Sequence, residues 1–406
     1  MNKLFIAIAI ILVFAGIIVS FLFFKELSLE YWIFGSGEVL MDKTGQVGDF
    51  IGGVVGTIFS LSGFIMLLIT LKMQASSDHL QKFEMIFFEM VRFHRDNIQE
   101  LEFDIYEHVG TTTLEKVNYT KRKVFRAVFT HFISCRNELQ TFLNKTSLAD
   151  IYQPGHLKKI EEIKTYRKGT FDLRKLAGLD MAWCITFFGL SNEGEQTLRR
   201  LFRSRYNDDL VNFLLSYVKL KPKREHSSYN RWKIISATKP FLKKVALIEH
   251  AYSNGNRYIS GFSIPQTWSY QTGLEDVSAL APYPKGFKKF YGGHQFRLGH
   301  YFRHLYQSVK FVDRQKNLSF ASKYDYVKIL RAQLSVYEQA ILVMNSLSSL
   351  GLVWDFAPDY EESRWYDRRK ERELISNYNL IKNLPNDTLY GINIMEYYPK
   401  VNFEIV

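Results

Sequence analysis

Two apolar stretches near the start of the chain constrain its fold more than any other feature. Residues 4–24 and 51–71 are each 21 residues long and contain no charged side chain. An α-helix rises about 1.5 Å per residue, so each stretch is long enough to cross the roughly 30 Å hydrocarbon core of a bilayer. The rest of the sequence contains no similar run. We therefore predict a transmembrane hairpin over residues 1–71, followed by one large water-soluble region.

A cleaved secretory signal is the alternative interpretation of the first stretch. Its apolar segment is longer than the usual ~7–15 residues, and Phe23, Phe24 and Lys25 stand where a cleavage site needs small side chains. The loop that follows holds two basic and five acidic residues, whereas basic residues follow the second stretch. Because positive charge stays on the cytoplasmic side, we expect a retained anchor with both termini in the cytoplasm.

Small residues recur every four positions along the second stretch, at Gly48, Gly52, Gly56 and Ser60. On a helix this spacing makes one ridge, which another helix can approach closely. The ridge can pack against the first stretch of the same chain or against a second copy of the chain, and the sequence leaves both possibilities open. The second possibility predicts a homo-oligomer in the membrane.

Hydrophobic periodicity predicts a mainly α-helical fold for the remaining residues. Apolar residues near heptad spacing, with neither Gly nor Pro, predict a helical stalk over residues 72–110, in which His94 interrupts the apolar seam. The other predicted parts follow in chain order. They are a helical region over residues 111–220, with helices at 121–143 and 193–220, a basic and irregular connector over 221–292, and a C-terminal helical module over 293–406.

The water-soluble region is strongly basic. Positions 1–71 hold three basic and five acidic residues, so the rest of the chain carries 50 basic against 36 acidic side chains, a formal charge of +14. Such a charge favours an acidic neighbour, either the anionic inner leaflet of the membrane or nucleic acid. The only cysteines, Cys135 and Cys184, form no CxxC pair, so we expect buried thiols and no cysteine zinc site.

The C-terminal module combines a packing stripe with polar residues. Leu298, Phe302 and Leu305 begin the core stripe of one predicted helix, and Arg297 and His304 lie on another of its faces.

A second predicted helix spans about residues 323–350 and carries Arg331, Glu338 and Asn345 as a polar seam with a seven-residue repeat. Burying an unpaired charge on so apolar a helix costs roughly several kcal/mol. We therefore predict that these three residues and His300 form a structural or regulatory polar network.

The module also carries a family resemblance. The segments GHYFRHLYQSVKFVD, YVKILRAQLSVYEQAILVMNSLSSLG and LISNYNLIKNLP, behind the amino-terminal GDFIGGVVGTIFSLSGFIMLLITLKMQ, resemble the phage abortive infection proteins of bacteria. The resemblance covers both ends of the chain but not the middle, between about residues 111 and 291. It implies a protein of the bacterial inner membrane that senses phage infection and halts the host, and it transfers no active site.

A ribonuclease is the main alternative. Arg297 and His304 are separated by six residues, which matches the loose signature of HEPN-type ribonucleases, in which a histidine acts as acid or base and an arginine stabilises phosphate charge. Two residues at this spacing also arise by chance. Basic and aromatic residues interleave over the same segment, so nucleic acid binding without cleavage is a further alternative.

Metal and nucleotide chemistry have little support. His300 and His304 share a helix face at a spacing suited to zinc, but no HExxH pattern accompanies them, and Arg297 and Arg303 would repel a cation. The chain has neither a GxxxxGK[ST] loop nor a strand-borne GxGxxG pattern. We expect no metal and no cofactor, and a non-enzymatic protein rather than an enzyme.

The hypothesis from sequence is a membrane-anchored effector of phage defence. Its cytoplasmic region senses infection, its stalk transmits the change, and its clustered second spans perturb the inner membrane. Expected partners are the lipid bilayer, further copies of the chain, and a phage-derived trigger or a partner defence protein, with nucleic acid as an alternative. A structural adaptor that recruits a separate toxin is a third possibility.

Overall fold

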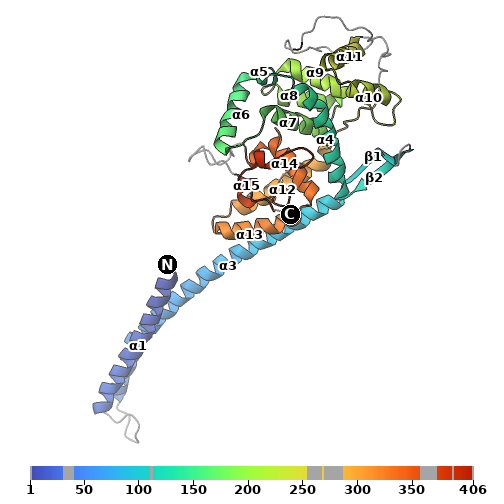
Figure 1. The fold of residues 1–406 in the computed structure, drawn as a ribbon. Coiled ribbons are helices and arrows are strands. Elements are labelled where there is room, and N and C mark those ends of the chain that lie inside the picture. The colour runs from blue at the N-terminus through green and yellow to red at the C-terminus, as the bar shows by residue number, and fades with distance from the viewer. Residues whose placement is uncertain are drawn as a thin grey trace. The chain divides into compact units, whose positions relative to one another are not determined.

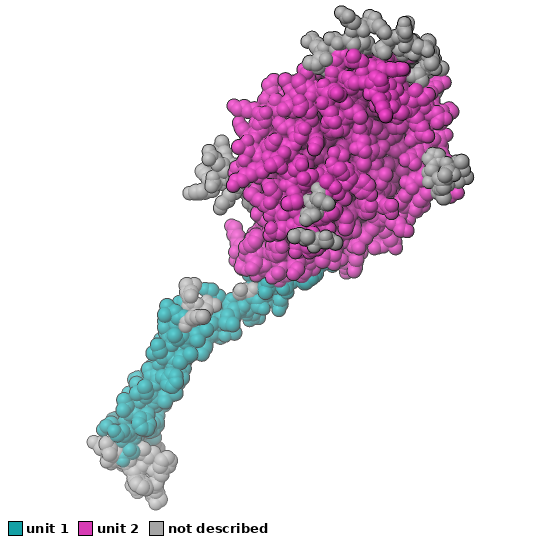
Figure 2. Space-filling view, in the orientation of Figure 1, with its two compact units in different colours: residues 1–89 teal, residues 90–406 magenta. Residues whose placement is uncertain are grey.

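The structure is a computed structural model, and it is mainly α-helical, as the sequence predicts (Figure 1). It describes residues 2–30, 41–109, 113–253, 268, 287–356, 373–385 and 388–404. The chain divides into two compact units, unit 1 with residues 1–89 and unit 2 with residues 90–406 (Figure 2). Each unit is described by itself below.

Unit 1 is helical. Its helices are α1 (Asn2–Glu30), α2 (Met41–Phe50), the π-helical turn η1 (Ile51–Val55) and α3 (Gly56–Gln99), whose residues up to Glu89 belong to this unit. Two helical stretches, residues 4–28 and 44–99, are long and apolar enough to cross a membrane. Most of their apolar side chains are exposed, which suits helices whose solvent is lipid.

The π-helical turn interrupts the small-residue ridge. The amide of Gly56 donates to the carbonyl oxygen of Ile51, five residues earlier, and the hydroxyl of Thr57 donates to the carbonyls of Gly53 and Val54 at 2.5 and 2.8 Å. A π-turn holds more residues than an α-turn, so it rotates the positions before it relative to those after it. The ridge is therefore not a straight line across η1.

The first helix contacts η1 and α3, and the ring of Phe23 stacks on that of Phe50 with centroids 4.0 Å apart. Ser62 donates a hydrogen bond of 3.0 Å to the carbonyl of Ala9, and a Cβ added to Gly16 would lie 3.1 Å from the ring of Phe59. By contrast, a Cβ added to Gly48 or Gly52 would meet no described atom within 4 Å. Within the residues that the structure describes, the amino-terminal half of the ridge is thus uncovered.

Unit 2 begins with the last turns of α3 and a β-hairpin. Strands β1 (Glu102–Val109) and β2 (Thr113–Thr120) pair antiparallel, with Glu102 opposite Thr120. The predicted helical stalk over residues 72–110 is therefore wrong beyond Gln99, where residues 102–105 alternate polar and apolar side chains with a period of two. Up to Gln99 the chain is helical, within α3.

The rest of unit 2 is a helical domain built around three helices. α4 packs along α7, and α14 packs against both. Its helices are α4 (Lys123–Leu143), α5 (Leu148–Ile151), α6 (Pro154–Arg167), α7 (Leu173–Phe188), α8 (Asn192–Phe202), α9 (Asp208–Lys219), α10 (Tyr229–Ala237), α11 (Phe241–Ser253), α12 (Gln295–Asp313), α13 (Phe320–Arg331), α14 (Val336–Leu347), η3 (Leu352–Trp354), α15 (Leu374–Tyr378) and η4 (Ile394–Glu396).

Several predicted helix boundaries need correction. The predicted helix over residues 193–220 is two helices, α8 and α9, because the Asn207 side chain accepts from the Asp209 amide and starts a new helix. The connector over residues 221–292 was predicted to be irregular, yet it contains α10 and α11. Most of its later part, residues 254–267 and 269–286, lies outside the described residues.

A buried ion pair ties α6 to the C-terminal segments. Arg167 Nη2 lies 3.2 Å from Oδ2 of Asp355, and the Ser376 hydroxyl donates to the same oxygen at 2.6 Å. Burial raises the pKa of Asp355 to about 6, although Arg167 opposes the shift. The pair fixes the segment after η3 on α6, so it positions one wall of the cavity described below.

Candidate functional site

Within unit 2, the end of α3 is buried at a junction of four helices. His94 and Ile98 are at most 1% exposed. The His94 ring lies 5.1 Å from the ring of Tyr301 and 6.4 Å from that of His304, both on α12, measured between centroids. Through these contacts the end of α3 packs on α12.

Glu338 is the charged centre of this junction. One of its carboxylate oxygens, Oε2, accepts from the amide and the hydroxyl of Ser335 at 2.9 and 2.5 Å, a capping box at the start of α14. The other, Oε1, accepts from the Tyr301 hydroxyl at 3.3 Å and lies 4.0 Å from Nε2 of His94. Arg122, next to the start of α4, lies 3.6 Å from Oε2.

Burial sets the protonation of the junction. It lowers the pKa of His94 to about 4, with smaller contributions from His304 and Arg122. Burial also raises the pKa of Glu338, while Ser335 and Arg122 oppose that shift. Neither ring nitrogen of His94 has a hydrogen-bond partner among the described residues. A neutral histidine therefore faces a buried carboxylate, an arrangement that a proton or a small helix shift would disturb.

The predicted polar network does not form as one cluster. The predicted helix over residues 323–350 is broken after Arg331, and α14 starts anew at Ser335, so the seven-residue repeat loses its common face. Arg331 donates to the carbonyls of Tyr378 and Asn379 at 3.3 and 3.1 Å. Asn345 lies near the end of α14, beside Gly351, and His300 is exposed on α12. Of the four residues of the predicted network, only Glu338 belongs to the junction.

The two residues of the ribonuclease alternative face different surroundings. Arg297 donates from Nε to the carbonyl of Glu102 at 2.8 Å, and its guanidinium lies over the rings of Phe103 and Phe296. His304 is half-buried against the rings of Phe93 and His94. Seven residues on a helix correspond to a rise of roughly 10 Å. The described contacts do not bring the two side chains to one point, so the alternative stays a prediction without geometric support.

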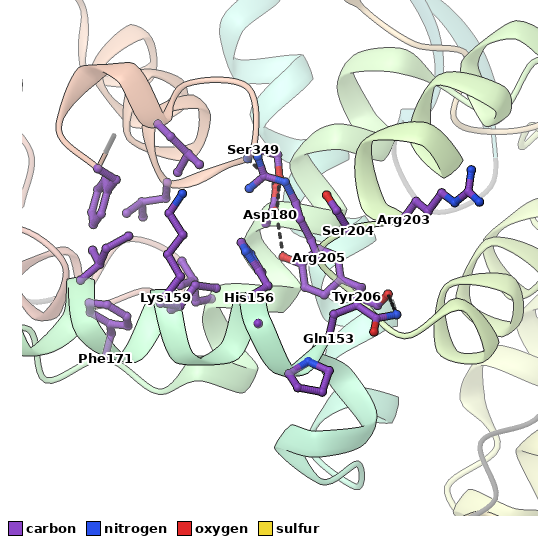
Figure 3. A pocket seen from close by; sticks show the side chains of 18 of the residues that line it. Gln153, His156, Lys159, Phe171, Asp180, Arg203, Ser204, Arg205, Tyr206 and Ser349 are labelled. Atoms are coloured by element: carbon purple, nitrogen blue, oxygen red, sulfur yellow. Dashed lines mark hydrogen bonds between the residues drawn. The ribbon is translucent and has the colours of Figure 1, made fainter. Parts of the chain in front are cut away.

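A cavity of about 690 Å³ lies near the C-terminal end of α14. It is lined by α6, α7 and the segments before α9 and after α14 (Figure 3). We name it the Asp180 cavity after the buried carboxylate on its wall. Asp180 Oδ2 accepts from the hydroxyls of Tyr206 and Ser349, each at 2.6 Å, and Oδ1 accepts from the Ser349 amide at 2.7 Å. The carboxylate thus joins α7 to two loops.

Basic side chains line this cavity. His156 and Lys159 extend from α6 and Arg205 comes from the segment before α9, whereas Arg203, from the same segment, points away from Asp180 (Figure 3). Burial, followed by the charge of Arg205, lowers the pKa of His156 to about 4. Apolar rings complete the wall, including Phe171. A concave apolar space with a few convergent cations suits a small anionic ligand.

The described residues do not offer a metal site. They contain no group of three or more His, Cys, Asp or Glu side chains that could hold an ion. Cys135 and Cys184 are free and fully buried, as the sequence predicted. Burial raises the pKa of the Cys184 thiol well above its usual value, and Asp180 adds to the shift, so this thiol is a poor nucleophile.

Sequence reasoning missed Asp180, although a signal was present. It is the one charged residue in the apolar run LAGLDMAWCITFF, and a single acid in an apolar helix indicates a buried, hydrogen-bonded carboxylate. Its partners Tyr206 and Ser349 come from distant segments, so the sequence alone does not reveal the cavity.

The comparisons with known proteins identify the C-terminal module. Residues 293–361 match the family model described as "Putative phage abortive infection protein", which confirms the resemblance found in the sequence motifs. The matched segment includes α12, α13 and α14, and so it contains Tyr301, His304 and Glu338 of the junction. No curated protein and no solved structure matched the chain.

Proposed function

We propose that this chain is a membrane-anchored effector of phage defence. Its cytoplasmic unit 2 senses infection, and its apolar helices then perturb the inner membrane of the bacterium, with both termini in the cytoplasm. The defence role follows from the match of residues 293–361 to an abortive infection family. The membrane role follows from the two helices that are long and apolar enough to span a bilayer.

The continuity of α3 is the observation that carries the proposed mechanism. This single helix begins at Gly56, within the apolar region, and ends at Gln99, after His94 and Ile98 are buried against α12 and α14. The family match covers those same two helices. A change in the matched module would therefore act directly on a helix that starts in the membrane.

The uncovered ridge supports action through a second copy of the chain. Gly48 and Gly52 are exposed, and the contacts of α1 with η1 and α3 leave open space beside both glycines. Without water there is little hydrophobic drive to join helices in lipid, so close packing of small residues is a main source of helix association. We infer that infection exposes or aligns these ridges, that copies of the chain cluster, and that the cluster makes the membrane permeable.

The direct test uses infected cells that carry Gly52→Leu. We expect dye entry and membrane depolarisation during infection with the native protein, and their loss with Gly52→Leu, because a branched side chain prevents close helix approach. Gly52→Ala is the matched control, since it keeps a small side chain at the same position and should retain permeabilisation. Unchanged permeabilisation by Gly52→Leu at equal protein level would refute the role of the ridge.

A second experiment tests transmission through the junction. Glu338→Gln removes the charge that faces His94 but keeps the size of the side chain, and we expect protection to change while the protein stays in the membrane. Lys316→Gln, an exposed charge at the end of α12, is the control. If infected cells that carry Glu338→Gln behave as native cells do, the junction does not transmit the signal.

A further inference from the structure

A second cavity in unit 2, of about 410 Å³, lies between the β-hairpin, α4 and the start of α12. We name it the histidine cavity, because His131 of α4 and His294, which precedes α12, both line it. Their ring centroids are 5.6 Å apart. His131 is 7% exposed and His294 is 3% exposed, so both imidazoles are more than nine-tenths buried.

Three polar atoms of this cavity lack a partner among the described residues. They are Nε2 of His131, Nδ1 of His294 and Nε of Arg224. A buried nitrogen that is left unpaired destabilises the fold, so unpaired groups are rare and require an explanation. Three of them around one cavity indicate that a molecule with hydrogen-bonding oxygens completes the site.

The charge around the cavity favours an anion. Lys223, Arg224 and Arg297 line it, and a fourth cation, Lys116, is paired with Asp104 at 2.7 Å; the remaining lining acid is Glu225. Among these charged side chains, four are positive and two are negative.

The first residues of α12, a helix of 19 residues, also line the cavity. The side chain of His294, the N-cap residue, makes no hydrogen bond to the amides of the first turn. The amides at a helix start carry partial positive charge, which binds phosphate.

An aromatic side chain stands beside these cations. Phe296 is 72% exposed, and the guanidinium of Arg297 lies 4.2 Å from its ring centroid. The ring lines the histidine cavity and also two neighbouring hollows along α12. So large an exposed ring contributes little to the core. Beside a phosphate site, an exposed ring flanked by arginine is suited to stacking a nucleobase.

We propose that the histidine cavity binds single-stranded nucleic acid. One backbone phosphate lies between His131, His294 and Arg224, and an adjacent base stacks on Phe296 with Arg297 beside it. Nothing in the proposed membrane mechanism requires this site, so the inference goes beyond that function. It gives the defence protein a chemical cue, because an oligonucleotide bound here contacts α12, the helix that also carries Tyr301 of the junction.

The test measures binding of a labelled single strand of about 12 nucleotides to the purified full-length protein in detergent, by fluorescence anisotropy. RNA and DNA strands of the same sequence show which of the two nucleic acids the cavity prefers. We expect Phe296→Leu to weaken binding about 5- to 100-fold, because a stacked base is lost. We expect Arg224→Gln to lower the slope of log affinity against log salt by about 0.7, because one phosphate contact is lost.

Two controls separate this site from general attraction to a basic protein. Phe320→Leu removes another exposed ring, and Lys158→Gln another exposed cation, both away from the cavity. Neither should change the affinity by more than about twofold. Equal loss of affinity in the controls, no binding of either strand, or full displacement of the strand by inorganic phosphate alone would overturn the proposal. The measurement needs no infected cells, so it stands or falls independently of membrane permeabilisation.

Discussion

The Asp180 cavity and the histidine cavity, both in unit 2, differ in whether their buried polar groups are paired. In the Asp180 cavity the carboxylate accepts short hydrogen bonds from Tyr206 and Ser349. In the histidine cavity, nitrogens of His131 and His294 have no partner among the described residues. An unpaired buried group costs about 1–3 kcal/mol, whereas a paired one stabilises the fold. The polar groups of the first cavity therefore serve the fold, and those of the second are available to a ligand.

The strongest test of this contrast is Asp180→Ala. It leaves the buried Tyr206 hydroxyl and two donors of the half-buried Ser349 without their acceptor, so we expect a loss of about 3–5 kcal/mol of unfolding free energy. Denaturant unfolding, followed by the fluorescence of the buried Trp183 and Trp354, measures it. Asp208→Ala is the control, because this exposed acid lines the same cavity at the start of α9 and should cost less than about 1 kcal/mol. Equal losses in the two variants would contradict the structural role of Asp180.

The second prediction concerns pH. Burial lowers the pKa of His294 to about 3 and that of His94 to about 4, below the ordinary 6.5. The unfolded chain therefore binds protons first as the pH falls. The stability from these neutral histidines is complete above pH 6.5 and is lost between pH 6.5 and about 4 for His94, and between pH 6.5 and about 3 for His294. At pH 5 each histidine accounts for a loss of about 2 kcal/mol.

A buried carboxylate opposes part of this loss. The pKa of Asp355 is raised to about 6, so protonation below pH 6 favours the folded state by about 1 kcal/mol at pH 5. Burial also lowers the pKa of His131 and that of His156, the latter to about 4. We therefore expect a net loss of unfolding free energy between pH 7 and pH 5, because the histidines outweigh Asp355. His294→Phe should remove the contribution of His294, about 2 kcal/mol at pH 5. An unchanged pH profile in that variant would show that His294 is not kept neutral by the fold.

The third prediction compares two substitutions that each remove polar atoms but should change the unfolding free energy in opposite directions. His131→Phe removes the unpaired Nε2 but keeps a ring against Phe103 and Phe290, so we expect a gain of about 1–2 kcal/mol in the free protein. Tyr206→Phe removes a hydroxyl that donates to Asp180, so we expect a loss of about 1.5–3 kcal/mol. Thermal unfolding of the purified variants measures both. If His131→Phe destabilises the protein as much as Tyr206→Phe does, the contrast between the cavities is wrong.

The sequence predicted the helical class and the two apolar helices because both depend on local patterns. Its errors also have local causes. The break before α14 coincides with the capping box of Ser335 and Glu338, a spacing that periodicity alone overlooks. The β-hairpin was read as helix because Leu101 and Ile105 continue the heptad spacing of α3, although the alternation from Glu102 onward indicates a strand.

Neither cavity was predictable, for a physical reason. His131 and His294 come from α4 and from the start of α12, and only the tertiary packing of those helices brings their rings within 5.6 Å. The sequence did single out Arg297 and the basic, aromatic segment around it, but with His304 as the partner. The structure directs Arg297 toward Phe103 and Phe296 instead, on the side of the histidine cavity.

The smallest effect is expected from Phe296→Leu, and it tests whether the rim of the histidine cavity is reserved for a ligand. Phe296 is 72% exposed, so its truncation should change the unfolding free energy by less than about 0.5 kcal/mol. Phe171 in the Asp180 cavity is 1% exposed and stacks on Tyr397, so Phe171→Leu should cost about 1–2 kcal/mol. Denaturant midpoints of the two variants compare them directly. A Phe296→Leu variant as destabilised as Phe171→Leu would mean that this ring is part of the core, and its exposure would then no longer argue for base stacking.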